Sequence, residues 1–468
     1  MVDSIQKEEK NIVEREGGLS KQLTSGQMLM ISIGSAIGTG LFLGSGYAVG
    51  LAGPGVILSY MIGAFIAFTV MIALSEMAVQ TPTAGSFGNY AETYLHRFVG
   101  FQVRWIYWFA QVIAIGGEMV AASIYMHFWF PTITPFIWMV IFSAILLTLN
   151  AVSVKTFGTA EYWFSMIKVV VIIFFIIIGA FILIYATHFG ISLAYLNYGG
   201  FFPKGLTGVW LATVVAIFSY IGVEVVAVTS GESKNPQKDV PRALRGMVLR
   251  LVLFYGLAIF IMIGMVPWTQ AGVGESPFVK AFSLIGIPLA ATIMNFVVLT
   301  AALSSSNTDI YLTSRMLFSL SRGKLGPKAF GKLSRFHVPF TALLVSGVGI
   351  AFSIALDYFL GSTSAYLDIF GIAVFGGIFA WIVILVSHIS FRRKYKKENL
   401  PIKYSVRGSV YLSIVGAILL TGVLISTLFT PGIEISIPSG IVALVVFTLL
   451  YLVYRKRNSK TDGGGTKA

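Results

Sequence analysis

The segment Ile33-Gly34-Ser35-Ala36-Ile37-Gly38-Thr39-Gly40 lies in the middle of the first long apolar stretch of the chain and decides how that stretch can fold. Each glycine inside a helix costs about 1 kcal/mol relative to alanine, so three of them within seven residues weaken the helix. We therefore expect the helix to open here. Glycines at this spacing can also form a packing face between helices, and the pattern alone leaves that interpretation open.

Similar apolar stretches recur along almost the whole chain. Of its 468 residues 56% are hydrophobic and 11% are charged, against about a quarter charged in soluble domains. Most stretches approach the roughly 20 residues that cross a bilayer as a helix. We predict an all-α integral membrane protein with twelve transmembrane helices, at Met28–Tyr47, Val56–Val79, Phe101–Phe130, Pro135–Val154, Phe164–Thr187, Val209–Thr229, Met247–Trp268, Pro288–Leu320, Val338–Leu360, Ala365–Ile389, Val410–Phe429 and Ile437–Tyr454.

The basic residues are distributed unevenly between the predicted loops. The chain has 33 Lys and Arg and a net charge of +14, yet the odd-numbered loops hold only Lys204 and Lys280. An excess of Lys and Arg marks the cytosolic side of a membrane protein, so both termini should lie in the cytoplasm. The basic clusters adjoin predicted spans, as at Arg392–Lys397, which favours lipid contact over nucleic-acid binding.

The sequence offers no sign of catalytic or cofactor chemistry. It has no cysteine, and its five histidines do not form metal-ligand spacings. A catalytic constellation at mid-membrane and a channel filter motif are also missing from the sequence. We therefore expect neither an enzyme nor a channel, and no cofactor.

A second interruption is expected in the sixth predicted span, at Phe218-Ser219-Tyr220-Ile221-Gly222-Val223-Glu224. Two broken helices five spans apart are typical of an inverted repeat with a binding site between them. This predicts five parts: a cytosolic tail at 1–27, repeats at 28–187 and 188–390, two further spans at 391–454 and a cytosolic tail at 455–468. Free amides after one break and free carbonyls at the other suit a zwitterion.

Four segments together resemble the amino acid-polyamine-organocation superfamily, and specifically its amino acid transporter family of bacterial and fungal permeases. They are Gly34-Ser-Ala-Ile-Gly-Thr-Gly-Leu-Phe-Leu-Gly-Ser-Gly46; Ser75-Glu-Met-Ala78 with Pro82, Gly85-Ser-Phe87 and Tyr90; Gly222-Val-Glu224 with Gly231-Glu-Ser-Lys-Asn-Pro236 and Val240-Pro-Arg-Ala243; and Leu303-Ser-Ser-Ser-Asn307 with Ser314-Arg-Met-Leu317.

The resemblance implies the five-plus-five inverted repeat of the leucine-transporter-like fold, two C-terminal helices, and alternating access around a central site. In relatives the substrate carboxylate meets backbone amides that correspond here to Ser35, Thr39 and Gly40. The substrate amine meets carbonyls that correspond to Ala36, Phe218 and Ile221. The ring of Phe218 matches the position of a gate over bound substrate.

Three ionisable residues, Glu118, Lys168 and Glu224, fall well inside predicted spans. Charges at such depth are costly and commonly functional. Lys168 resembles a fifth-span lysine of proton-coupled relatives, which would place it near first-span carbonyls and the hydroxyl of Ser304 or Ser305. It is our first candidate for the coupling proton, although a permanent cation bracing the opened helix remains an alternative; Glu224 and Glu118 follow as candidates.

Asp309 departs from the less polar residues that relatives usually carry at this point of the eighth span. We expect it to pair with Arg315, with orientation toward the transport pathway as the alternative.

The sequence thus predicts a secondary active permease of the cell membrane that imports an L-amino acid together with a proton. Its partners would be the amino acid, the proton and the lipid bilayer. Ala36, Ile221 and Val223 favour a neutral side chain, while Glu118 and Glu224 leave a cationic one open. Exchange of amino acids or polyamines is the alternative mechanism, and the sequence leaves the oligomeric state open.

Overall fold

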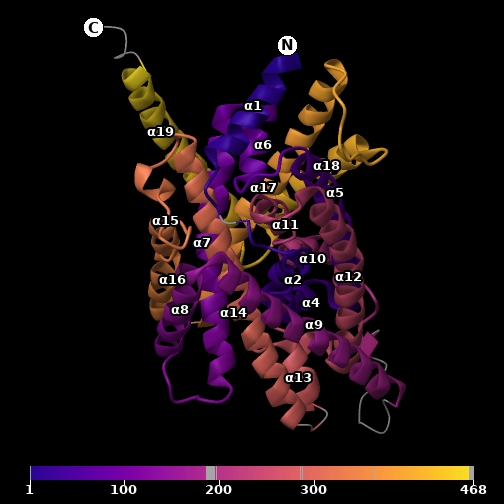
Figure 1. Ribbon diagram of the computed structural model, residues 1–468. Helices are drawn as coiled ribbons and strands as arrows, with labels where there is room; N and C mark the ends of the chain where they lie inside the picture. Colours follow the sequence, from indigo (N-terminus) through magenta and orange to yellow (C-terminus); the bar gives the residue numbers. More distant parts are fainter. Residues whose placement is uncertain are drawn as a thin grey trace, which may run out of the picture.

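The computed structural model describes residues 2–19, 21–185, 195–196, 198–272, 274–284, 286, 288–360 and 362–462. The predicted repeat boundary at residues 187 and 188 and the end of the tail at 463–468 lie outside them. Within the described residues all regular secondary structure is helical, apart from one isolated β-bridge (Figure 1). The all-α prediction is therefore confirmed.

The helices follow one another along the chain. They are α1 (Val2–Arg15), α2 (Ser25–Ala36), α3 (Thr39–Phe42), α4 (Gly44–Ala52), α5 (Val56–Gln80), α6 (Ser86–Tyr94), α7 (Arg97–His127), α8 (Pro135–Val152), α9 (Val154–Ile184), α10 (Gly205–Tyr220), α11 (Val225–Thr229), α12 (Pro236–Met265), α13 (Pro277–Leu284), α14 (Pro288–Arg322), α15 (Phe340–Ser346), α16 (Val348–Leu360), α17 (Ser362–Lys397), α18 (Ser409–Ser426) and α19 (Ser436–Asp462).

Among the described residues, nine helical segments are long and apolar enough to cross a membrane. The other three predicted spans are broken or shorter. The first is divided into α2, α3 and α4, while the seventh and ninth contain shorter apolar helices at Arg250–Met265 and Phe340–Phe352. Multi-pass membrane insertion is thus supported, whereas the count of twelve and the inverted repeat stay predictions.

The bundle has a buried centre and an apolar periphery. In α7 and the α10–α11 segment 89% of the most apolar stretch is buried, against 22% in α8 and α19. The outer helices expose large apolar side chains, such as Trp163, Phe174 and Ile177 on α9. A helix that is apolar on its exposed face suits lipid rather than water, so the outer helices form the lipid-facing shell.

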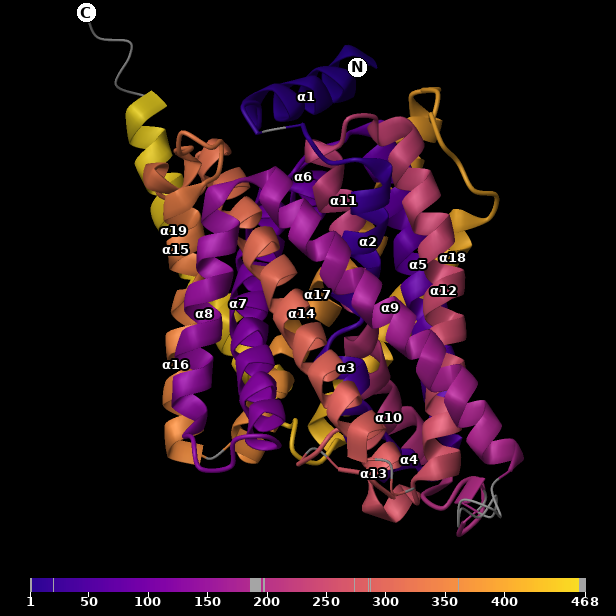
Figure 2. The ribbon, with the colours of Figure 1, turned by 60° about the horizontal axis from the view of Figure 1, so that its bottom comes forward.

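Helix α1 lies across one end of the bundle, the same end at which α19 finishes (Figures 1 and 2). Arg15 at its C-terminus donates to the Glu92 carboxylate at 2.8 and 3.0 Å, and Arg104 donates to the same carboxylate at 2.8 Å. Although burial raises the pKa of Glu92, its contacts with Arg104 and Arg15 outweigh burial and lower that pKa to about 2. The N-terminal helix is therefore anchored by a charged cluster on α6 and α7.

Candidate functional site

The first predicted break is present. Helix α2 ends at Ala36, Ile37 and Gly38 leave helical geometry, and α3 begins at Thr39. A side chain at Gly38 would approach the Ser305 hydroxyl to 2.8 Å and a Glu118 carboxylate oxygen to 3.1 Å. Glycine is thus required here because α7 and α14 come close to the opened backbone.

The second predicted break is also present, between the end of α10 at Tyr220 and the start of α11 at Val225. Gly222 has φ +111°, which favours glycine, and a Cβ there would lie 2.8 Å from the Ser35 carbonyl oxygen. The two opened segments are therefore in direct backbone contact. The glycine pattern alone allowed either helix packing or helix opening. The structure shows both, because the helices open at these glycines and neighbouring helices pack closely against them.

Glu224 stabilises the second break. Its carboxylate accepts hydrogen bonds from the Gly222 amide at 3.0 Å, the Tyr107 hydroxyl at 2.7 Å and the Trp381 indole at 3.1 Å. These three donors come from α7, α17 and the break itself. They satisfy a fully buried carboxylate, which favours a structural role over proton coupling.

Tyr255 on α12, which the sequence analysis did not select, joins the two breaks. Its hydroxyl lies 2.6 Å from the Ala36 carbonyl oxygen and 2.8 Å from the Ser219 carbonyl oxygen. A hydroxyl has one proton, so it donates fully to one carbonyl at a time. Tyr255 can therefore alternate between the first and sixth spans.

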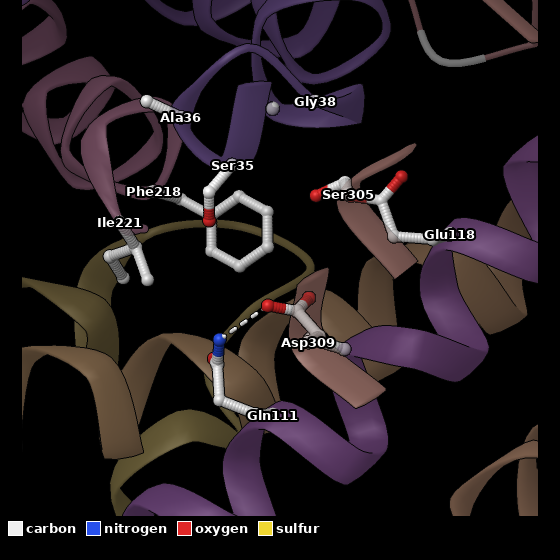
Figure 3. A pocket seen from close by; sticks show the side chains of 11 residues that line it. Ser35, Ala36, Gly38, Gln111, Glu118, Phe218, Ile221, Ser305 and Asp309 are labelled. Carbon is white, nitrogen blue, oxygen red and sulfur yellow. Dashed lines mark hydrogen bonds between the residues drawn. The ribbon is translucent and has the colours of Figure 1, made fainter. Parts of the chain in front are cut away.

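A pocket lies between these segments and the helices α7 and α14 (Figure 3). Its cavity volume is about 20 Å³, room for about one water molecule, so the lining side chains nearly fill the pocket in this conformation. Five of the six expected substrate residues line it, and the sixth, Thr39, lines a smaller adjoining cavity. The lining residues are Ser35, Ala36, Gly38, Gly40, Gln111, Ala114, Glu118, Phe218, Ile221, Ser305 and Asp309.

Two buried polar atoms of this pocket have no hydrogen-bond partner within the described part of the chain. They are the Ser35 hydroxyl and one Glu118 carboxylate oxygen, on residues that are each 5% exposed. Buried polar groups are normally paired. The unmet hydrogen-bonding capacity points to a polar ligand. Ser35 lies in the last turn of α2, so it offers its hydroxyl to the pocket while its amide belongs to the helix.

Lys168 lies behind the pocket and is fully buried. Its ammonium donates to the Gly34 carbonyl, to the Ile37 carbonyl at 3.0 Å and to the Ser304 hydroxyl at 2.7 Å. These are the kinds of contact expected from the sequence. Ser304 is thus the serine that meets the lysine, whereas Ser305 lines the pocket near Glu118.

Glu161, which the sequence analysis missed, belongs to the same network. Ser304 donates to the Glu161 carboxylate, and Asn307 donates to it at 2.9 Å. A signal was available, because Glu161, Ser165 and Lys168 are spaced four and three residues apart and so share one helix face. The result is a buried chain from Lys168 through Ser304 to Glu161.

The expected pairing of Asp309 with Arg315 is wrong. Arg315 donates to Glu232 at 3.0 Å, while Asp309 lines the pocket and accepts from the Gln111 amide at 2.9 Å. Residues six apart on a helix are separated by about 240° around its axis, so they face different neighbours. The alternative, orientation toward the pathway, matches the observed position.

No cluster of three or more potential metal ligands occurs in the parts of the chain that the structure describes. The pocket instead combines opened backbone, two carboxylates, hydroxyls and one aromatic ring. This donor set is suited to binding a small zwitterion by hydrogen bonds.

Comparison with known proteins places the chain in a family. A family model described as amino acid permease matches residues 27–457. The chain is 39% identical to the uncharacterized amino acid permease YtnA of Bacillus subtilis (strain 168), over 93% of this chain and 94% of that protein. It is 39% identical to a putative histidine permease of the same organism, over 94% of each. It is also 38% identical to a D-serine/D-alanine/glycine transporter of Escherichia coli (strain K12), over 84% and 85%.

These relatives are transporters rather than enzymes. Their names give different substrates. The matches extend over nearly all of the helices described above, which confirms the resemblance inferred from the four sequence segments. The chain belongs to the amino acid permease family, within the amino acid-polyamine-organocation superfamily.

Proposed function

We propose that the protein is a secondary active permease of the cell membrane that imports an L-amino acid together with a proton, by alternating access around the pocket between its two broken helices. The observation that carries the proposal is the position of Lys168. Its ammonium donates to the carbonyls of Gly34 and Ile37. The residues next to these two in the opened segment line the pocket. Protonation and substrate binding would therefore act on the same backbone.

Recognition of the α-carboxylate and α-amine would use the opened segments. The substrate carboxylate would meet the amides of Thr39 and Gly40, which begin a short helix and so lack a partner from a preceding turn. The Thr39 amide would exchange its hydrogen bond with Glu118 for one to the substrate. The Ser35 hydroxyl, buried and without a partner among the described residues, is a third donor. The substrate amine would meet the carbonyls of Ala36, Phe218 and Ile221, with Tyr255 moving to the Ser219 carbonyl as the substrate arrives.

The ring of Phe218 is suited to act as the gate. It lines the pocket and packs against Phe370 of α17, with ring centroids 4.3 Å apart. An aromatic pair across two helices can separate and close as these helices move, and it excludes water from bound substrate when closed.

The coupling step would be loss of a proton from Lys168. A neutral amine donates fewer and weaker hydrogen bonds than an ammonium, so the Gly34 and Ile37 carbonyls would be released. The opened segment would then be free to change conformation. Ser304 connects Lys168 with Glu161, which provides an acceptor for that proton. Because both sites share the same backbone, proton and substrate affinities would be linked reciprocally.

Orientation in the membrane follows from charge. The end of the bundle that carries α1 and the end of α19 also carries the basic last turn of α17, with Lys394, Lys396 and Lys397. An excess of positive charge faces the cytosol. We therefore assign both termini to the cytoplasm.

The test is uptake into proteoliposomes under an imposed inward proton gradient. Wild-type protein should accumulate a radiolabelled amino acid against its gradient, and Lys168→Met should lose this accumulation while retaining substrate binding. Lys204→Met, which removes an exposed lysine from a loop, is the matched control and should transport normally.

Two results would contradict the proposal. Accumulation by Lys168→Met with wild-type pH dependence would make the lysine a brace, and Glu118 would become the leading candidate for coupling. Uptake that requires an amino acid or polyamine inside the vesicles, and is indifferent to the pH gradient, would identify an exchanger.

A further inference from the structure

One wall of the pocket is formed by two polar side chains from different helices, Gln111 of α7 and Asp309 of α14 (Figure 3). Both are almost completely buried, with 3% and 6% of their surface exposed. The Gln111 amide donates to one Asp309 oxygen at 2.9 Å. This bond fixes the orientation of the carboxylate, which lines the space opposite Phe218 and Ile221.

The carboxylate of Asp309 has no basic partner in the part of the chain that the structure describes. No Lys, Arg or His there lies within 4.0 Å of it. The nearest candidate by sequence, Arg315, is bound to Glu232, and the ammonium of Lys168 is held by carbonyls and Ser304. A buried carboxyl group without a cation is unfavourable as an ion, so it either holds a proton or binds a ligand that supplies the positive charge.

The pocket as a whole carries an excess of acidic groups. Glu118 contributes a second carboxylate, one oxygen of which is buried without a partner among the described residues, and the lining includes no basic side chain. Lys168 behind the pocket interacts electrostatically with both carboxylates, but it also faces Glu161, so one ammonium is shared among three acidic groups. A neutral amino acid brings one ammonium and one carboxylate and leaves the remaining excess unchanged. A substrate with a second positive charge would compensate it.

We infer that Asp309, oriented by Gln111, binds the positively charged end of the side chain of a cationic amino acid. This rests on the proposed function and specifies its substrate class: an L-amino acid whose side chain ends in an ammonium or guanidinium group. The apolar residues Ala36 and Ile221, which favoured a neutral substrate on sequence alone, would contact the methylene part of such a side chain.

The first measurement needs no variant. The assay measures uptake of radiolabelled lysine into proteoliposomes that contain the full chain. Unlabelled lysine and arginine are compared as competitors with norleucine and citrulline, which have similar shapes but uncharged ends. We expect lysine and arginine to compete roughly ten- to a hundredfold better, the ratio typical of one charged hydrogen bond. Equal competition by the charged and uncharged members of each pair would overturn the inference.

The second measurement uses Asp309→Asn, which keeps the shape of the side chain and removes its charge. The variant should lose the preference for lysine over norleucine while its affinity for norleucine changes less than about threefold. Asp309→Glu, which restores the charge, should recover part of the preference. Asp368→Asn, the same substitution outside the pocket, is the matched control and should retain it.

The outcomes separate this inference from the proposed function. If Asp309→Asn binds lysine like wild type but no longer accumulates any amino acid under a proton gradient, Asp309 carries the proton and the inference is wrong. If the wild type accumulates only uncharged amino acids, the proposed function stands and the substrate class is wrong. If the wild type accumulates no amino acid at all, the proposed function itself fails.

Discussion

Replacing Gly222 by alanine tests whether contact between the two helix breaks forms the substrate pocket. Gly222 has φ +111°, a conformation that an alanine adopts only with strain. Its new Cβ would lie 2.5 Å from the Ser35 hydroxyl oxygen, 2.8 Å from the Ser35 carbonyl oxygen and 2.9 Å from the carbonyl carbon. The hydroxyl can rotate away, but the two backbone atoms cannot move without displacing the end of α2.

The expected magnitude follows from this geometry. Strained backbone of this kind costs about 1–3 kcal/mol, and forced contacts in a packed interior cost about as much again. Moving the two breaks apart relieves the forced contacts, but the same movement opens the pocket. If about 2–3 kcal/mol of this cost falls on the conformation that binds substrate, the substrate Kd should rise roughly thirty- to 150-fold.

The assay is equilibrium binding of radiolabelled substrate to purified protein in lipid nanodiscs, with thermal unfolding as a check that the variant is folded. Gly256→Ala is the matched control, because a Cβ at Gly256 meets nothing within 4 Å. It should bind like wild type. If Gly222→Ala binds within about twofold of wild type and unfolds at the same temperature, the contact between the breaks does not shape the site.

Three further predictions address the gate, the proton chain and the N-terminal helix. Phe218→Ala should weaken substrate binding about two- to tenfold, the value of one aromatic pair, while Phe218→Trp should bind normally. Glu161→Gln should shift the pH dependence of uptake and leave substrate Kd unchanged; an unchanged pH profile would remove Glu161 from the proton chain. Glu92→Gln should increase amide hydrogen exchange in α1 at pH 7, because the bonds from Arg15 weaken. In the wild type, the pKa of Glu92 is lowered to about 2, so its contribution is complete above the ordinary value of 4.5 and is lost as the pH falls toward 2. Lowering the pH from 7 to 5 should therefore leave α1 exchange, corrected for intrinsic rate, unchanged.

Much of the fold could be predicted from the sequence because its signals are local. Apolar stretches of membrane-spanning length, with charges confined to their ends, require helices in a bilayer. The two helix breaks could be located because glycine clusters weaken a helix wherever it packs. The ninth span was predicted less accurately because a hydropathy pattern continues across Gly347, which separates α15 from α16. The apolar part of the seventh, Arg250–Met265, is only a part of the continuous helix α12.

The candidate site could be predicted in part, through residues that are anomalous on their own. A lysine such as Lys168 in an apolar span has to find oxygen partners, and it does so on the opened first span. Asp309 was also recognised as anomalous, but its partner was assigned wrongly. The helical angle between residues six apart already argued against Arg315.

The sequence by itself thus determined the membrane class, the positions of the helix breaks and the buried charges that need partners. The tertiary structure alone decided which residues became those partners. Tyr255 meets Ala36 across 219 positions of the chain, and Gln111 meets Asp309 across 198. A helical period fixes the face on which a side chain lies, but the residue opposite that face depends on how the helices pack. For this reason the acidic wall of the pocket, and the substrate class inferred from it, emerged only from the folded molecule.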